Sequence, residues 1–216
     1  MIDSNYFNKD YFEDGIVSKK SCYTNYRWIP ELTIPMAYRL AKTLNLQEDE
    51  NILEIGCSKG YMIKALRLLG FDAYGTDISE YAISHVDTDI KDFCKLTTAK
   101  NPLPFKQHFN WVVTKDTLEH VPTEGLHEIF SQYSDKCDMM YHVIPLGDNE
   151  KFRIPEYHLD ASHIQIHNED WWNDLFAQYG WEIKSLKYKV KGIKENWAEH
   201  HPTGNGFFTL VKKSHA

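Results

Sequence analysis

The stretch NILEIGCSKGY, residues 51–61, decides the fold that this sequence predicts. Its first half is an apolar run of strand length, and it leads directly into Gly56, a short polar turn and Gly60. The following MIKALRLLG places its apolar residues on one helical stripe and stops at Gly70, a residue type common at helix C-termini. A second apolar run, FDAYGTD, then ends on Asp77. The order strand, turn, helix, strand predicts two parallel strands joined by a helix.

The same alternation continues along the chain and predicts one α/β domain over residues 1–216. Apolar positions at helical spacing indicate further helices at 31–46, 79–86, 123–133 and 169–180. Apolar runs of strand length lie near 90–93 and at 109–116, 137–147, 181–191 and 206–213. The last two strands are joined by an irregular link at 192–205, so they can pair antiparallel. The sequence thus predicts a doubly wound, mostly parallel sheet with helices on both faces.

The composition disfavours several classes of protein. The 216 residues carry a net charge of −7 and no long run of lysine or arginine, which disfavours binding to DNA or RNA. Four widely spaced cysteines without a Cys-x-x-Cys pair indicate reduced thiols rather than a disulfide framework or a zinc site. No run reaches the roughly 20 apolar residues that span a bilayer, and residues 1–15 do not resemble a signal peptide. We therefore expect a soluble, cytoplasmic protein without a membrane partner.

The glycine turn and Asp77 together predict a nucleoside site. In doubly wound sheets, ligands bind beyond the carboxyl ends of the strands, where this turn lies. Gly56 lets a ligand approach the backbone closely, and a carboxylate at Asp77 can accept hydrogen bonds from two ribose hydroxyls. An NAD site normally has the spacing Gly-x-Gly-x-x-Gly, whereas three residues separate Gly56 from Gly60. The spacing therefore disfavours a dinucleotide.

Three segments in order, LEIGCSKG (53–60), YGTDIS (74–79) and DTLEHV (116–121), resemble motifs of class I S-adenosylmethionine-dependent methyltransferases. The resemblance covers about residues 45–185. It implies a Rossmann-like methyltransferase fold, with a seven-stranded sheet that ends in an antiparallel pair, and S-adenosyl-L-methionine as the cofactor. Ser58 stands where the family usually has glycine. The cofactor-binding residues that the resemblance implies are Glu54, Gly56, Cys57, Ser58, Gly60, Asp77, Ile78, Asp92, Phe93, Asp116 and Thr117.

The resemblance also bears on the acceptor of the methyl group. The form DTLEHV is common among small-molecule and sugar methyltransferases, which implies O-methylation of a small polar acceptor such as a sugar or sugar nucleotide. The Asn-Pro-Pro-Tyr type of tetrapeptide found in some amine methyltransferases does not follow the strand at 109–116. Two alternatives remain: a methyltransferase acting on protein or tRNA, and a catalytically silent methyltransferase-like subunit. The aromatic-rich residues 1–30 are expected to form an arm or lid in front of a core at 31–216.

A hydroxyl acceptor needs help to lose its proton, and histidine suits that task near neutral pH. His163 is the preferred general base, because it follows the strand at 137–147 and Asp160 lies close enough in sequence to orient its ring. His120 of the DTLEHV motif is the second candidate. The segment around His163 also allows a purely structural loop, or a metal site that adds His158 and His167. Because hard ions such as Mg²⁺ prefer several oxygen ligands, we expect no metal requirement.

Overall fold

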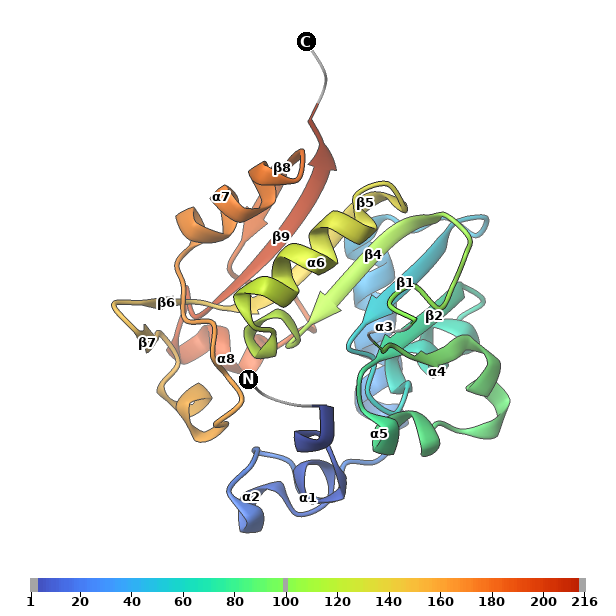
Figure 1. Cartoon of the computed structure of the whole chain (residues 1–216), viewed down its shortest axis with the longest axis horizontal. Helices are drawn as coiled ribbons and strands as arrows, with labels where there is room; N and C mark the ends of the chain where they lie inside the picture. Colours follow the sequence, from blue (N-terminus) through green and yellow to red (C-terminus); the bar gives the residue numbers. More distant parts are fainter. Residues whose placement is uncertain (1–3, 99–100, 214–216) are drawn as a thin grey trace.

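The computed structural model describes residues 4–98 and 101–213. Within them, seven strands form one sheet in the order β3-β2-β1-β4-β5-β9-β8 (Figure 1). Strands β3, β2, β1, β4 and β5 run parallel, whereas β9 pairs antiparallel with both β5 and β8. The strands are β1 Asn51–Ile55, β2 Asp72–Asp77, β3 Cys94–Leu96, β4 Phe109–Lys115, β5 Cys137–Pro145, β8 Trp181–Lys187 and β9 Asn205–Lys212. This topology confirms the predicted doubly wound sheet and its antiparallel end.

Helices cover both faces of the sheet, as Figure 1 shows. They are α3 Pro30–Leu44, α4 Tyr61–Leu68, α5 Glu80–Ser84, α6 Thr123–Tyr133 and α7 Glu169–Gln178. One face packs against α3 and α4, and the other packs against α6 and α7. Neighbouring residues of a strand point to opposite faces, so Ile52 lies in the first core and Leu53 in the second. Burial on both faces explains why the parallel strands are continuously apolar.

The aromatic-rich N-terminal segment folds into an arm of three short helices, η1 Ser4–Tyr6, α1 Lys9–Phe12 and α2 Gly15–Ser18. Its rings form a small third core with Ala82 of α5. Glu13 forms an ion pair with Lys59, just after β1, and accepts a hydrogen bond from the Tyr81 hydroxyl at 3.0 Å. The Ser79 hydroxyl, just after β2, donates to the Phe7 carbonyl. The arm therefore lies across the carboxyl ends of β1 and β2.

One strand begins later than the sequence predicts. Residues 90–93, expected as a strand, belong to the 3₁₀ helix η2 (Thr88–Phe93), and β3 begins only at Cys94. Lys64 of α4 pairs with Asp87 at 2.6 Å, at the start of this helix. The ion pair ties the start of η2 to α4. The sequence pattern at 90–93 predicted a strand because it reflects only neighbouring residues and not this contact with another helix.

The link between the last two strands is more ordered than expected. It contains the helix α8 (Glu195–His200), and β8 ends at Lys187 instead of continuing to residue 191. Gly192 has a φ of 79°, and its N–H donates to Glu195 Oε2 at 3.0 Å. A left-handed turn held by the Glu195 carboxylate thus precedes the helix.

The remaining described elements lie in loops at the carboxyl end of the sheet. They are η3 Leu118–His120, β6 Gly147–Asp148, β7 Lys151–Phe152 and η4 Pro155–Leu159. Strands β6 and β7 form a short antiparallel hairpin. None of the described helices is both long enough and apolar enough to cross a membrane.

Candidate active site

Two glycines with a left-handed backbone shape the turn after β1. Gly56 and Gly60 have φ values of 82° and 74°, which residues with a Cβ rarely adopt. The Gly56 N–H donates to the Thr76 carbonyl of β2 at 2.7 Å. A Cβ on Gly56 would lie 2.4 Å from Thr117 Oγ1, and one on Gly60 would lie 2.8 Å from Cys94 Sγ. Gly56 therefore allows the loop after β4 to approach, and Gly60 allows the start of α4 to pack against β3.

Asp77, at the end of β2, faces this turn and holds it. Its Oδ2 accepts a hydrogen bond from the Ser58 N–H at 2.7 Å, and its Oδ1 accepts one from the Ser79 N–H at 2.8 Å. Each carboxylate oxygen can accept two hydrogen bonds, so Asp77 keeps capacity for two ligand hydroxyls. Burial raises the pKa of Asp77, although these backbone donors oppose the shift. Ser58 has a φ of 52°, which explains why glycine suits this position.

A cavity of about 490 Å³ lies at the carboxyl ends of β1, β2 and β4. The predicted site residues that line it are Gly56, Ser58, Asp77, Ile78, Asp116, Thr117 and His120. The arm contributes Phe7, Tyr11 and Phe12 to its wall. Small-molecule sites commonly have volumes of about 300–1,000 Å³, so the cavity can hold a nucleoside-sized ligand.

A second cavity of about 370 Å³ lies between the glycine turn and residues 22–27 of the arm. Two further predicted residues, Glu54 and Cys57, line this second cavity together with Lys115. Burial raises the pKa of Glu54 to about 8, and the positive charge of Lys115 opposes that shift. The glycine turn borders both cavities, so a ligand lying along this turn can contact both.

Asp92 and Phe93 are not brought to either cavity, nor is Gly60. Asp92 is exposed, and the Phe93 ring packs under the Arg67 guanidinium, 3.3 Å from its carbon. Leu96 and Thr97 line the first cavity instead, next to Asp77. The residues after Phe93, and not Asp92 and Phe93 themselves, therefore line the first cavity.

Asp116, directly after β4, lines the first cavity and carries two ion pairs. Lys115 lies 2.7 Å from its Oδ2, and Lys194 from the start of α8 contacts its Oδ1. Burial would raise the pKa of Asp116, but the two lysines outweigh it and hold the pKa well below its usual range. Asp116 is therefore a carboxylate whose charge is already balanced.

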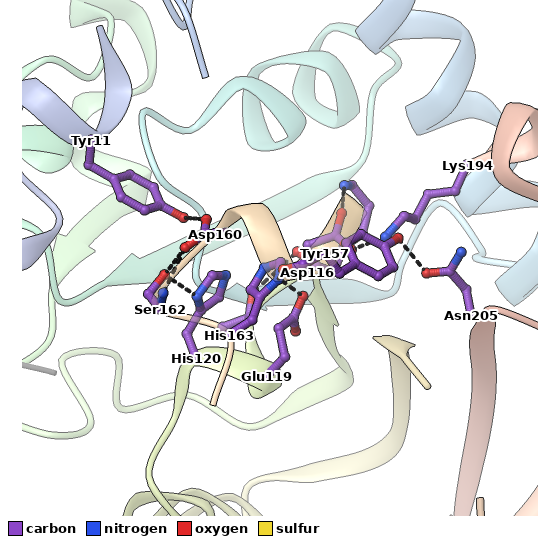
Figure 2. A network of polar contacts seen from close by, with 12 residues as sticks. Tyr11, Asp116, Glu119, His120, Tyr157, Asp160, Ser162, His163, Lys194 and Asn205 are labelled. Carbon is purple, nitrogen blue, oxygen red and sulfur yellow. Dashed lines mark hydrogen bonds and ion pairs between the residues drawn. The ribbon is translucent and has the colours of Figure 1, made fainter. Parts of the chain in front are cut away.

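A chain of hydrogen bonds fixes the ring of His120 (Figure 2). The Tyr11 hydroxyl donates to Asp160 Oδ2 at 2.9 Å, and the Ser162 hydroxyl donates to Asp160 Oδ1. Ser162 Oγ therefore accepts from His120 Nδ1, which lies 2.8 Å away. The proton sits on Nδ1 and leaves Nε2 as a lone-pair nitrogen. Burial, with neighbouring His163, lowers the pKa of His120 to about 4, so the ring is neutral at pH 7.

His163 lies beside His120, with 4.6 Å between the ring centroids. Its Nδ1 donates to the Tyr157 carbonyl at 2.7 Å, and its Nε2 lies 4.0 Å from Glu119 Oε1. Burial lowers its pKa, so this ring is also neutral at pH 7. The predicted orientation of His163 by Asp160 is wrong, because the Asp160 carboxylate serves the hydrogen-bond chain to His120 instead.

Glu119 completes this group, and we call Glu119, His120 and His163 the His–Glu cluster. Its side chain is 0% exposed, and neither carboxylate oxygen has a hydrogen-bond partner among the described residues. Burial, with Asp116 nearby, raises the pKa of Glu119 to about 8. The cluster thus combines two neutral imidazoles with one buried carboxyl group next to the first cavity.

A family model for a methyltransferase domain matches residues 31–186, well over half of the chain. The chain belongs to this methyltransferase family. No curated protein matched the sequence. The methyltransferase uses S-adenosylmethionine as its cofactor, as the three sequence motifs predicted.

Solved structures share the fold of this methyltransferase at low sequence identity. A chain from the complex of the Haloferax volcanii Trm112 methyltransferase activator with a methyltransferase has a TM-score of 0.64 and 15% identity, covering 86% of this chain and 92% of that chain. Magnesium protoporphyrin IX methyltransferase from Synechocystis PCC 6803, with bound SAH, has a TM-score of 0.60 and 13% identity over 84% and 82% of the two chains. Mitomycin 7-O-methyltransferase MmcR has a TM-score of 0.59 and 12% identity over 83% and 54%.

The geometry of the first cavity fits the cofactor. The Asp77 carboxylate keeps free acceptor capacity at one end, where ribose hydroxyls would bind. Asp116 and His120 follow β4, on the other side of β1 from Asp77, and both line the cavity. A Cβ at Gly56 would collide with Thr117, so the loop after β4 can approach this turn only with glycine there.

Several site residues escaped the sequence analysis. Tyr11 and Ser162 act through Asp160, and Lys194 reaches Asp116 across 78 positions of the sequence. Glu119 belongs to the DTLEHV motif but was given no role of its own. Its position directly before His120, just after a strand, could have indicated a site residue. For Lys194 no local pattern existed, because its partner lies in another part of the chain.

Replacing Asp77 by alanine is expected to weaken binding of S-adenosylmethionine to this methyltransferase by about 1.5–3 kcal/mol per hydrogen bond lost. The change removes the charged acceptor for the ribose and also the acceptor that holds the Ser58 N–H. Calorimetric titration with SAH measures the effect. Asp72→Ala, an exposed residue at the start of the same strand, is the matched control and should bind SAH as the wild type does.

Proposed function

We propose that this methyltransferase transfers the methyl group to a hydroxyl oxygen of a small polar acceptor, such as a sugar or sugar nucleotide. The observation that carries the proposal is the pair of neutral imidazoles, His120, which lines the cavity after β4, and its neighbour His163. The cofactor supplies an electrophilic methyl group on its sulfonium, so the protein has mainly to align and activate the acceptor.

The imidazole pair favours a hydroxyl over an amine. A hydroxyl is a poor nucleophile at neutral pH and must lose its proton as the new bond forms. Both rings carry their proton on Nδ1, so each has an Nε2 lone pair that can interact with the acceptor's hydroxyl. Since burial lowers both pKa values, these lone pairs are available across the physiological pH range. An amine acceptor that binds unprotonated would not need such groups.

The arm supports a small acceptor rather than a macromolecule. Phe7, Tyr11 and Phe12 close one wall of the cavity, and Tyr11 reaches across to Asp160 in the loop after β5. We propose that the arm acts as a lid that separates the reacting groups from water.

The four free cysteines, three of them buried, support a cytoplasmic setting.

Replacing Tyr11 by phenylalanine is expected to lower the free energy of unfolding by about 1.5–3 kcal/mol, because it removes a hydrogen bond to a buried carboxylate. We also expect a higher KM for the acceptor, since the lid loses its contact with the opposite wall. Urea unfolding and steady-state kinetics measure the two effects. Tyr38→Phe, on the exposed side of α3, is the control; equal stability of both variants would argue against the lid contact.

Product analysis tests the proposed reaction. The protein is incubated with S-adenosylmethionine and a panel of sugars, sugar nucleotides, catechols and small amines, and SAH release is followed. We expect turnover with hydroxylated acceptors and a methyl group on oxygen in the product. Methylation of amines, of tRNA or of protein alone would contradict the proposal. SAH binding without turnover on any acceptor would favour a catalytically silent subunit.

A further inference from the structure

The His–Glu cluster places three potential metal ligands around one point beside the cofactor cavity (Figure 2). Glu119 and the two histidines each offer one ligand atom, and these atoms all lie within 4.8 Å of one another. Two atoms bound at about 2.0–2.2 Å to one ion lie at most about 4.4 Å apart. Small side-chain movements would therefore bring all three ligand atoms to bonding distance of one ion. We propose that the cluster binds a divalent first-row transition-metal ion.

The hydrogen bonds of both histidines orient them as metal ligands. A histidine that binds a metal through one nitrogen usually donates its other N–H to a carbonyl, a carboxylate or a polar group held by one. His163 donates from Nδ1 to the Tyr157 carbonyl, and His120 donates from Nδ1 to Ser162, which in turn is bonded to Asp160. Both Nε2 atoms are therefore left with lone pairs.

Glu119 supplies the second, independent observation. Buried polar groups normally have hydrogen-bond partners, and a fully buried carboxyl group without one is costly. Both Glu119 oxygens lack such a partner among the described residues, and one of them faces His163 at 4.0 Å. The nearby cations, Lys115 and Lys194, contact Asp116 instead. A bound cation would be the missing partner of Glu119.

The ligand set indicates the class of ion. Mg²⁺ prefers oxygen ligands, whereas imidazole nitrogens suit ions such as Mn²⁺, Co²⁺, Fe²⁺ and Zn²⁺ when a carboxylate is also present. Two imidazoles with one carboxylate leave coordination positions open for oxygen atoms of a ligand. This ligand set differs from the metal site weighed in the sequence analysis, which combined His163 with Asp160, His158 and His167. The proposed site also departs from the expectation that the enzyme needs no metal.

A metal ion at this site would activate the acceptor's hydroxyl, and this part of the inference rests on the proposed function. A divalent ion lowers the pKa of a hydroxyl bound to it and orients that oxygen. The acceptor's O–H bond then breaks with the proton passing to water, the O–CH₃ bond forms, and the S–CH₃ bond of the cofactor breaks to leave SAH. An acceptor with two adjacent hydroxyls, such as a sugar or a catechol, could fill two open positions.

Titration with Mn²⁺ tests the site directly. The full chain is stripped with EDTA and desalted, and binding is followed by calorimetry and by loss of the electron paramagnetic resonance signal of free Mn²⁺. We expect one ion per chain. Glu119→Gln and His163→Ala should each weaken Mn²⁺ binding by about 100-fold or more, since each removes a ligand. His158→Ala, in the same loop but outside the cluster, should bind Mn²⁺ as the wild type does.

A variant that leaves all three ligands in place sharpens the test. Ser162→Ala removes the acceptor for His120 Nδ1 together with the hydroxyl's hydrogen bond to Asp160, and loss of such a partner typically lowers metal affinity by about 10–100-fold. SAH binding by each variant, measured on the same samples, shows that the fold is intact. A purely structural role for Ser162 would leave Mn²⁺ affinity unchanged.

The outcomes separate this inference from the proposed function. A wild-type protein that binds SAH but none of Mn²⁺, Co²⁺ and Zn²⁺ overturns the metal site and leaves O-methylation with a histidine base. Equal turnover with EDTA and with Mn²⁺ overturns the catalytic role of the ion. Stoichiometric Mn²⁺ binding lost in the ligand variants supports the site. If Mn²⁺ binds as expected while methylation occurs only on nitrogen, the proposed function fails and the metal site stands.

Discussion

Replacing His163 by alanine is expected to lower the turnover number by about 100-fold or more, while affinity for S-adenosylmethionine stays nearly unchanged. His163 lies outside the lining of the cofactor cavity but next to His120, where the acceptor's hydroxyl would be activated. The change removes one lone-pair nitrogen from that place, whether it acts as a base or as a metal ligand. Steady-state kinetics and calorimetry with SAH measure the two quantities.

Two comparison variants make the result specific. His167→Ala lies four positions away, with its ring stacked on Trp171 at 3.6 Å between centroids, and should keep near wild-type turnover. His120→Ala should lower both turnover and cofactor affinity, because His120 lines the cavity itself. Normal turnover by His163→Ala with the true acceptor would argue against activation by this residue and would favour an amine acceptor.

Replacing Gly56 by valine is expected to abolish measurable binding of S-adenosylmethionine. The residue has a φ of 82°, a strained conformation for a β-branched side chain, and its Cβ would lie 2.4 Å from Thr117 Oγ1. The new side chain would also enter both cavities, because Gly56 borders each of them. Calorimetry with SAH measures the loss, and circular dichroism with thermal unfolding shows whether the fold survives.

Gly70→Val separates backbone strain from blocking of the site. Gly70 has a φ of 90°, close to that of Gly56, but no atom of the described residues lies within 4 Å of the position of its Cβ. Both variants therefore carry a strained backbone, and only Gly56→Val obstructs the cavity. We expect Gly70→Val to lose stability and keep SAH affinity. Equal SAH affinity in both variants would show that the ligand binds elsewhere.

Local chemistry explains what could be predicted from the sequence. The glycine turn, Asp77 and the strand alternation depend on neighbours within one β–α–β unit, and the structure places Gly56 and Asp77 in one cavity wall. Such features need only local backbone conformation and the period of apolar residues.

Long-range contacts explain what could not be predicted. The role of Asp160 is set by Tyr11, 149 positions earlier, and not by its sequence neighbour His163. The helix α8 brings Lys194 to Asp116, although the sequence of that link shows no regular pattern. Because these contacts form only when the arm and the loops pack over the sheet, sequence spacing carried no information about them.

The measurement that tests the central claim most directly is a calorimetric titration of the full chain with S-adenosylmethionine, SAH and NAD. We predict that S-adenosylmethionine and SAH each bind one molecule per chain, that NAD gives no binding heat, and that Asp77→Ala and Gly56→Val weaken SAH binding in increasing order. Binding of NAD without binding of S-adenosylmethionine, or wild-type SAH affinity in both variants, would contradict the placement of the cofactor between Gly56 and Asp77.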